Sequence, residues 1–398
     1  MIKPEGDVQW DSPLAITACM CACIAAYGVY LALPLILGAL SDLYGFSSRE
    51  IGWVGAAENA GLLLGSALVS MLAKSGRFRL MMMAGIVLAI LGNVMTSFVH
   101  TFEPMAGVRL ATGFGSGTCY SAGITCLSLT RQSWRHFSVF IVVLVLMNSL
   151  ELWLVPSILS SVGLRGLYVG FGAAFLIPLA LVPLIPAVAV SVAPSSSAAD
   201  VRSVVVADTV RSLAWWCLTG VVLFNVAASA FWAYSERIGA SIGLAPQAVA
   251  NTLTLCNLFS LTGSVLAYWL SLRWGQHRPQ LAAMAVMLAV FVAWSMHLSA
   301  TGYVIGVLIF FEVWSMAQVY QLGTLNGIDR SGQFVALVPA AQGLGQSAGP
   351  FIAGLLLGWH WGYSQVLMAM IVFIAGCFSA YLHVYGRLRR IQPRLADA

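Results

Sequence analysis

The sequence predicts an all-α integral membrane protein with twelve transmembrane helices. Of its 398 residues, 60% are hydrophobic and only 8% are charged, and the mean hydropathy is +0.89. Soluble domains carry about 25% charged residues, so this composition excludes a soluble globular chain. A spanning helix needs about 20 mostly apolar residues, and runs of this length exclude the alternating pattern of a transmembrane barrel.

Twelve apolar runs of spanning length follow one another along the chain, with short polar breaks between them. We place the first six near residues 14–40, 50–72, 79–100, 104–129, 136–161 and 166–192. The last six lie near residues 212–235, 246–271, 280–299, 303–326, 332–358 and 362–386.

The basic residues indicate how the chain crosses the membrane, because Lys and Arg are retained in short cytoplasmic loops. With both termini in the cytoplasm, the outer segments hold only Arg49, Arg165 and Arg237, and Arg109 is the one basic residue within a span. The net charge of +5 therefore belongs to the cytoplasmic face and requires no nucleic acid. The predicted cytoplasmic residues are Lys3, Lys74, Arg77, Arg79, Arg131, Arg135, Arg202, Arg211, Arg273, Arg278, Arg330, Arg387, Arg389, Arg390 and Arg394.

A hydrophilic interval containing PSSSAAD at 194–200 separates six spans from six. We therefore expect an N-terminal six-helix bundle at 1–192, a cytoplasmic linker at 193–211, and a C-terminal six-helix bundle with a basic tail at 212–398. GSAL at 65–68 recurs as GSVL at 263–266, and KSGRFR at 74–79 aligns with RWGQHR at 273–278. Both repeats are offset by about half the chain, which indicates duplication of a six-helix unit and two pseudo-symmetric bundles.

The histidines and cysteines indicate neither a metal site nor a zinc enzyme. All eight cysteines lie in predicted spans, and no HExxH spacing occurs among the six histidines, so we expect packing roles and no metal. The opening MIKPEGDVQWDSP is polar and partly acidic, so we expect no cleavable signal peptide.

Arg109 raises the main chemical question, because a guanidinium within the bilayer cannot lose its proton and must find a carboxylate, carbonyls or water. Three acids lie in spans: Glu58, Glu151 and Glu312. Glu58 and Glu151 lie at depths from which each could meet Arg109. One base neutralises one acid, so desolvation favours the protonated form of at least two carboxyls, and such groups can carry protons. The alternative is that Arg109 only holds helices together.

Glycines follow Arg109 at helical spacing. Arg109, Gly113 and Gly117 lie four residues apart on one stripe, where small residues permit close helix packing. Packing alone also accounts for Gly115. The GFGSG and GLGQSAG stretches lie inside apolar helices rather than after a strand, so a phosphate-binding loop and ATP hydrolysis have no support.

These motifs resemble those of the major facilitator superfamily. The stretch from Arg109 through Gly113 and Gly115 to Gly117 resembles the family's RxxxGxG signature in the fourth helix, and Gly76 and Arg77 resemble the end of its basic loop signature, with Ala73 in place of aspartate. The stretch from Gly345 to Gly354 resembles GxxxGPxxxG and contains Gly349 and Pro350. The fifth helix, where the family's proton-coupled exporters carry that motif, has only ELWLVP at 151–156, which argues against a drug antiporter.

The resemblance implies a central cavity lined by the first, fourth, seventh and tenth helices. Each of these helices carries a polar or aromatic stripe at helical spacing, which suits a small aromatic or amphipathic solute. Tyrosine and tryptophan are also common at membrane interfaces, which is the competing interpretation. The candidate cavity residues are Tyr27, Tyr30, Tyr120, Asn225, Ser229, Trp232, Trp314, Gln318 and Gln321.

We therefore expect a proton-coupled secondary transporter of the inner or plasma membrane, working by alternating access as a monomer, with no cofactor beyond the proton gradient. Its coupling candidates are Glu58, Arg109, Glu151 and Glu312. Import with a proton and efflux against one are both open. A transporter-like sensor and a membrane enzyme acting on lipid are the remaining alternatives.

Overall fold

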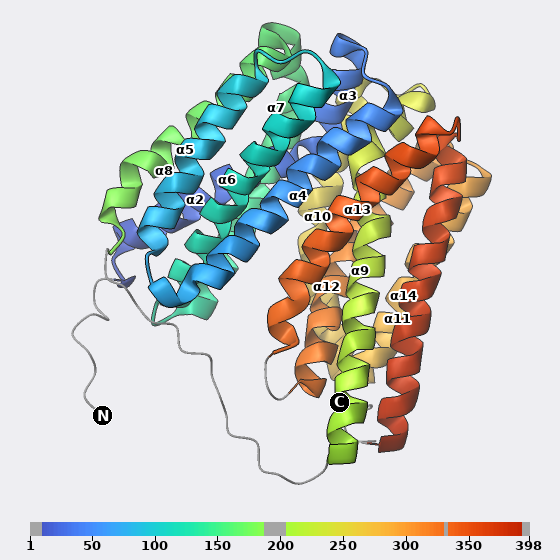
Figure 1. Cartoon of the computed structure of the whole chain (residues 1–398). Coiled ribbons are helices and arrows are strands. Elements are labelled where there is room, and N and C mark those ends of the chain that lie inside the picture. The colour runs from blue at the N-terminus through green and yellow to red at the C-terminus, as the bar shows by residue number, and fades with distance from the viewer. Residues whose placement is uncertain (1–9, 187–203, 330–332, 392–398) are drawn as a thin grey trace, which may run out of the picture. The chain divides into compact units, whose positions relative to one another are not determined.

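The computed structural model describes residues 10–186, 204–329 and 333–391, and every regular element in these ranges is a helix (Figure 1). Contacts divide the chain into two compact units, Met1–Ala193 and Pro194–Ala398. The PSSSAAD segment and the predicted cytoplasmic residues Lys3, Arg202, Arg330 and Arg394 lie outside the described residues.

The first unit begins with a span that is broken in its middle. Helices α2 and α3 meet at Ala32, just before Pro34, whose ring removes one backbone donor and favours a new helix start. A capping box between Ser47 and Glu50 then starts α4. The helices of this unit are α2 (Pro13–Leu31), α3 (Leu33–Tyr44), α4 (Ser48–Leu72), α5 (Phe78–Thr96), α6 (Phe102–Ser128), α7 (Ser133–Ala174) and α8 (Leu176–Leu181).

Helix α7 joins the fifth and sixth predicted spans. Its backbone leaves the helical region at Gly163, where φ is 65° and ψ is −175°. A side chain is strained at this φ, so glycine permits the break. The sequence predicts spans at 136–161 and 166–192, and the break falls between them.

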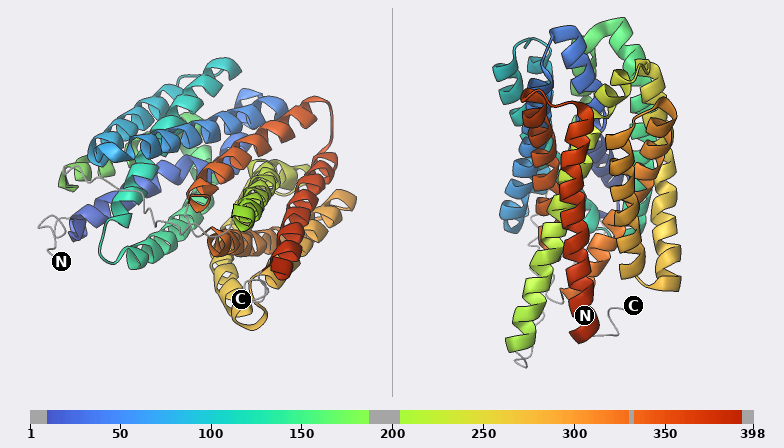
Figure 2. Two further views of the ribbon diagram at one scale, coloured as in Figure 1. Left: turned by 60° about the horizontal axis from the view of Figure 1, so that its bottom comes forward. Right: turned by 90° about the vertical axis from the view of Figure 1, so that its right-hand side faces the viewer.

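The second unit contains six long helices. They are α9 (Val204–Ser241), α10 (Pro246–Trp274), α11 (His277–Met296), α12 (Ala300–Ile328), α13 (Val338–Gly358) and α14 (Tyr363–Ile391). Helices α9 and α14 run side by side in all three views (Figures 1 and 2). Helix α9 begins within the predicted linker at 193–211, so residues 204–211 are helical, and 193–203 lie outside the described residues.

Nine helices in the described part of the chain are long and apolar enough to span a membrane. One of these segments, Arg135–Leu184, contains the break at Gly163 and therefore provides two spans. Helices α6 and α13 are also long, with 27 and 21 residues, but their small and polar residues lower their hydropathy. Together these give the twelve predicted spans.

The repeated GSxL segments occupy equivalent places in the two units. In each unit the second and third long helices pack on the fourth: α4 and α5 on α6, and α10 and α11 on α12. A Cβ on Gly65 would meet the backbone of Phe114 and Thr118 in α6, and a Cβ on Gly263 would meet the backbone oxygen of Glu312 in α12. An equivalent glycine thus permits an equivalent helix contact in each unit.

Candidate functional site

The first polar cluster surrounds Arg109, which is 1% exposed in α6. Its Nη2 lies 2.5 Å from Oε2 of Glu58 in α4, and its Nε donates to the same oxygen at 2.5 Å. The sequence allows Arg109 to meet either Glu58 or Glu151, and the structure pairs it with Glu58. The charge of the guanidinium is therefore compensated inside the first unit.

Helix α5 supplies two further acceptors to Arg109. Its Nη1 donates to Oδ1 of Asn93 at 2.9 Å and to Oγ1 of Thr96 at 3.3 Å. The amide of Asn93 donates to the carbonyl of Ala89, and the hydroxyl of Thr96 donates to the carbonyl of Gly92, so both oxygens are oriented to accept. Their spacing of three residues puts them on one face of the helix.

Tyr168 of α7 completes this cluster, with its ring centroid 5.1 Å from Cζ of Arg109. A cation over an aromatic face is attracted by the ring quadrupole. Sequence reasoning missed Asn93, Thr96 and Tyr168. An asparagine and a threonine three residues apart in an apolar span were the available signal.

Close contact between α4 and α6 positions the ion pair. A Cβ on Gly113 would meet the carbonyl oxygen of Glu58, and a Cβ on Gly117 would meet that of Leu62. A Cβ on Gly61 would meet the carbonyl of Leu110. Gly61, Gly113 and Gly117 therefore bring the two backbones together, and that approach places Glu58 beside Arg109; Gly115 instead packs on the α5 backbone at Gly85 and Ala89.

Glu151 of α7 lies apart from this cluster. Its Oε1 is buried and has no hydrogen-bond partner among the described residues. A Cβ on Gly28 of α2 would lie 3.7 Å from this oxygen and 3.4 Å from the ring of Phe171. The carboxyl thus faces an apolar seam between α2 and α7, where no described base forms an ion pair with it.

Helices α2 and α6 together form an aromatic cluster. The Tyr27 ring is 5.3 Å from Tyr30 and 4.2 Å from Tyr120 of α6, measured between centroids. Tyr27 directly precedes Gly28 in α2, so the cluster begins one residue away from the position that faces Glu151, about 100° around the helix. The structure brings together all three aromatic residues that the sequence proposes for the first unit.

In the second unit, Asn225 and Ser229 of α9 face the packing seam with α13. The hydroxyl of Ser229 donates to the carbonyls of Asn225 and Gly345, at 2.6 and 3.2 Å. A Cβ on Gly345 would meet the side chain of Asn225 and one on Gly349 would meet the hydroxyl of Ser229. These polar groups are positioned by helix packing, and Pro350 follows within α13.

Trp232 of α9 and Trp314 of α12 belong to one aromatic cluster in the second unit. Trp314 lies 6.4 Å from Trp232 and 5.2 Å from Phe310, measured between centroids. Gln318 is exposed, whereas Gln321 is 1% exposed and neither of its amide atoms has a partner among the described residues. A buried amide without a partner marks a place for water or a ligand group.

Glu312 faces a different side of α12. It lies nine residues from Gln321, which puts the two side chains about 180° apart around a helix with 3.6 residues per turn. Its Oε1 accepts a hydrogen bond of 2.6 Å from the hydroxyl of Thr262 in α10. The sequence indicates no partner for Glu312, and in the structure the Thr262 hydroxyl is its partner.

The basic loop of the first unit turns at Gly76, where φ is 63° and the N–H donates to the carbonyl of Ala73. Arg77 is the N-cap of α5.

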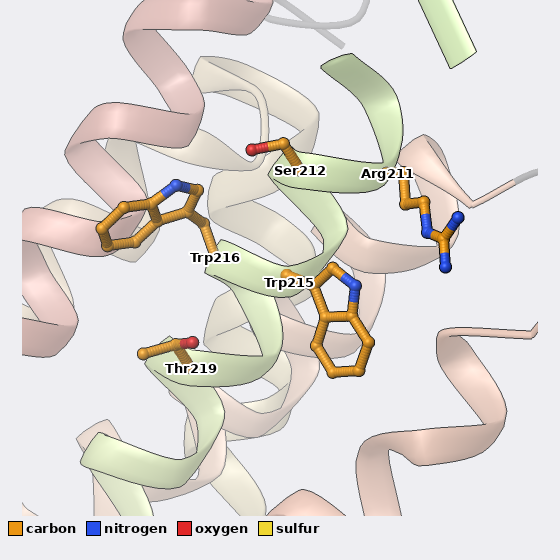
Figure 3. A pocket seen from close by; sticks show the side chains of 5 residues that line it. All are labelled: Arg211, Ser212, Trp215, Trp216 and Thr219. Carbon is orange, nitrogen blue, oxygen red and sulfur yellow. The ribbon is translucent and has the colours of Figure 1, made fainter. Parts of the chain in front are cut away.

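A hollow of about 500 Å³ lies beside the start of α9, where Arg211 and Trp215 extend from the helix (Figure 3). In the part of the chain that the structure describes, no group of three His, Cys, Asp or Glu residues could hold a metal.

The membrane spans and the repeated six-helix units define a multi-pass membrane protein. The family model of the Major Facilitator Superfamily matches residues 18–328, and the chain belongs to this family. It is therefore a transporter and not an enzyme. No curated protein matches the chain.

Solved structures with the same fold are distant in sequence. A bacterial homolog of the human lysosomal transporter Spinster, inward-facing and unoccupied, has a TM-score of 0.75 at 11% identity, covering 94% of this chain and 97% of its own. The nucleoside transporter NupG has a TM-score of 0.70 at 12% identity, covering 93% and 99%. A D-xylose–proton symporter has a TM-score of 0.69 at 14% identity, covering 93% and 96%.

Proposed function

We propose that this transporter is a proton-coupled symporter that takes up a small aromatic or amphipathic solute by alternating access. The observation that carries the proposal is the buried, unpartnered oxygen of Glu151. An ionised carboxylate in such a place costs several kcal/mol, so the group holds a proton until a change of its surroundings releases it. A transporter that couples to a proton gradient needs a group of this kind.

Glu58 serves a different role in this proposal. Its carboxylate is held by Arg109, and Arg109 has further acceptors in Asn93 and Thr96. The carboxylate and the guanidinium therefore compensate one another's charge, and the pair joins α4 to α6. We therefore assign Glu58 and Arg109 to holding α4, α5 and α6 in register, and Glu151 to proton binding.

The solute class follows from the aromatic cluster. Tyr27, Tyr30 and Tyr120 group aromatic rings with hydroxyls, and Tyr27 lies one residue from Gly28, which faces Glu151; such a group suits a solute with a flat apolar part and hydrogen-bonding groups. Among the fold neighbours, one is a nucleoside transporter and one a D-xylose–proton symporter. Both kinds of solute belong in the first screen, with small peptides and aromatic amino acids.

The proposal is tested in two steps. A thermal-shift screen of purified protein at two pH values identifies a stabilising solute. Proteoliposomes are then given an inward pH gradient, acidic outside, and accumulation of that solute is measured for the wild type, Glu151→Gln and Glu103→Gln. Glu103 is an exposed acid in the first turn of α6 and serves as the matched control.

We expect accumulation by the wild type and Glu103→Gln, and equilibration without accumulation by Glu151→Gln. Accumulation only under the reversed gradient would identify the efflux antiporter instead. Solute entry that ignores both gradients would contradict proton coupling altogether.

A further inference from the structure

A groove of about 680 Å³ lies between α10 and α11, with α12 as its floor. No part of the proposed transport mechanism uses it. Its walls are almost entirely apolar and include Leu266, Leu270, Ala282, Val286, Ile309 and Met316.

The groove is open along its length. Leu266, Trp274 and Val286 are 42%, 58% and 44% exposed. In a bilayer, an open apolar groove on a spanning unit is filled by hydrocarbon, because water gains no hydrogen bonds there. The length of α10 from Thr262 to Trp274 is about 18 Å at 1.5 Å per residue, which is comparable to one leaflet.

The two ends of the groove differ in charge. Arg278 and Trp274 line the end where α10 and α11 are joined, and this end is predicted to be cytoplasmic. Glu312 lines the deeper part, where its carboxyl accepts the hydroxyl of Thr262. The basic end therefore lies at the membrane boundary, where the lipid headgroups are. Glu312 lies at the depth of the acyl chains, and its carboxyl already accepts the hydrogen bond from Thr262.

We propose that the groove binds an anionic phospholipid of the cytoplasmic leaflet, with its phosphate at Arg278 and one acyl chain along the groove toward Glu312. A basic residue at the cytoplasmic boundary attracts anionic headgroups, and the groove adds chain contacts that a flat surface does not offer. An amphipathic cation seated on Glu312 fits less well, because its charged group would leave the headgroup region and cross the apolar walls.

The test measures lipid binding to the whole protein in detergent by native mass spectrometry. The probes are phosphatidylglycerol and phosphatidylcholine of identical chains. For the wild type we expect a first phosphatidylglycerol that binds more tightly than the next ones, and no such preference for phosphatidylcholine. Arg278→Gln should weaken that first binding about fivefold, the effect expected of one basic residue near the surface.

Arg273→Gln is the matched control, because Arg273 lies in the same joining region but stacks on Trp269, 4.2 Å from its ring centroid, and does not line the groove. It should change the first binding less than twofold. Ala282→Trp fills the groove and should remove the tight binding whatever the headgroup, whereas Ala285→Trp, on an exposed alanine outside the groove, should not.

Three results would overturn the proposal. Equal effects of Arg278→Gln and Arg273→Gln would indicate general attraction to the basic loop. Unchanged binding in Ala282→Trp would place the lipid elsewhere. Full competition by soluble glycerol phosphate would show that the site binds only the phosphate group and not the acyl chain. None of these measurements depends on transport, so their failure leaves the proposed function untouched.

Discussion

A guanidinium buried in the membrane requires a counter-charge and hydrogen-bond acceptors. Three kinds of group around Arg109 supply them. Glu58 compensates the charge, Asn93 and Thr96 accept hydrogen bonds from Nη1, and the ring of Tyr168 lies over the cation. A buried ion pair is not in itself a source of stability, because desolvation offsets the attraction. Removing one partner alone is costly, since the other charge remains buried.

Glu58→Gln should therefore destabilise the first unit. The guanidinium would retain neutral acceptors but lose its counter-charge, and breaking a buried pair in this way costs about 3–5 kcal/mol. The measurement is thermal unfolding in detergent, with Glu103→Gln as the exposed control. An unchanged Tm for Glu58→Gln would mean that Arg109 is hydrated rather than paired.

Glu312→Gln should leave gradient-driven accumulation intact. The side chain points about 180° away from Gln321 around α12, toward the groove and Thr262. The sequence makes Glu312 a candidate for proton binding or for anchoring a cationic solute. Accumulation and binding of the solute by this variant are measured at two pH values. Loss of accumulation with retained exchange would show that Glu312 carries the coupling proton. Loss of binding at high pH alone would show that Glu312 anchors a cationic solute.

At the level of elements, the backbone contact between α4 and α6 determines where the charged residues meet. This contact depends on glycines whose Cβ positions are already occupied by the neighbouring backbone. The GSxL repeat provides the same contact between α10 and α12. The seam between α9 and α13 is built in a similar way, from Gly345 and Gly349 against Asn225 and Ser229.

Gly117→Ala should destabilise the protein, because the new Cβ would meet the carbonyl oxygen of Leu62, and a helix backbone cannot give way as a side chain does. Overpacking of this kind costs about 1–3 kcal/mol or more. Gly107→Ala in the same helix meets nothing within 4 Å and should be neutral or slightly stabilising. Thermal unfolding of both variants checks the difference, and equal Tm values would contradict the close contact.

Much of the element pattern could be predicted, because apolar length and helical spacing are local properties of a sequence. Twelve spans, the repeat and the Arg109–Gly113–Gly117 stripe follow from them. The partner of Arg109 could be narrowed only to Glu58 or Glu151, since depth along a helix says nothing about the direction a side chain faces. Asn225 and Ser229 had the spacing of a cavity stripe, but their contacts are with α13, which no local pattern reveals.

For the whole molecule, the arginine asymmetry predicts that both termini and the linker are cytoplasmic. Single cysteines on a cysteine-free background test this by labelling with a membrane-impermeant reagent. Ser196 represents the linker, and Ala245 represents the outer segment at 236–245. Ala245 is preferable to Gly243, whose φ of +83° disfavours any side chain. Labelling of both positions from the same side would contradict the twelve-span topology.

The two-unit organisation also separates the proposed roles. The ion pair, the aromatic cluster and Glu151 all lie in the first unit, whereas the lipid groove lies in the second. Solute and proton should therefore influence one another through α2, which carries Tyr27 beside Gly28 and faces Glu151. Linkage requires that solute binding change proton binding by the same free energy with which protons change solute binding.

The most direct test of the central claim, that Glu151 is the coupling proton site, is the proton exchange that accompanies solute binding. Purified protein in weakly buffered detergent solution is mixed with the solute identified by thermal shift, and a pH indicator reports protons taken up or released. We predict a stoichiometric change for the wild type, Glu58→Gln and Glu312→Gln, and none for Glu151→Gln with solute binding retained. An undiminished proton change in Glu151→Gln would contradict the account and place the coupling group elsewhere.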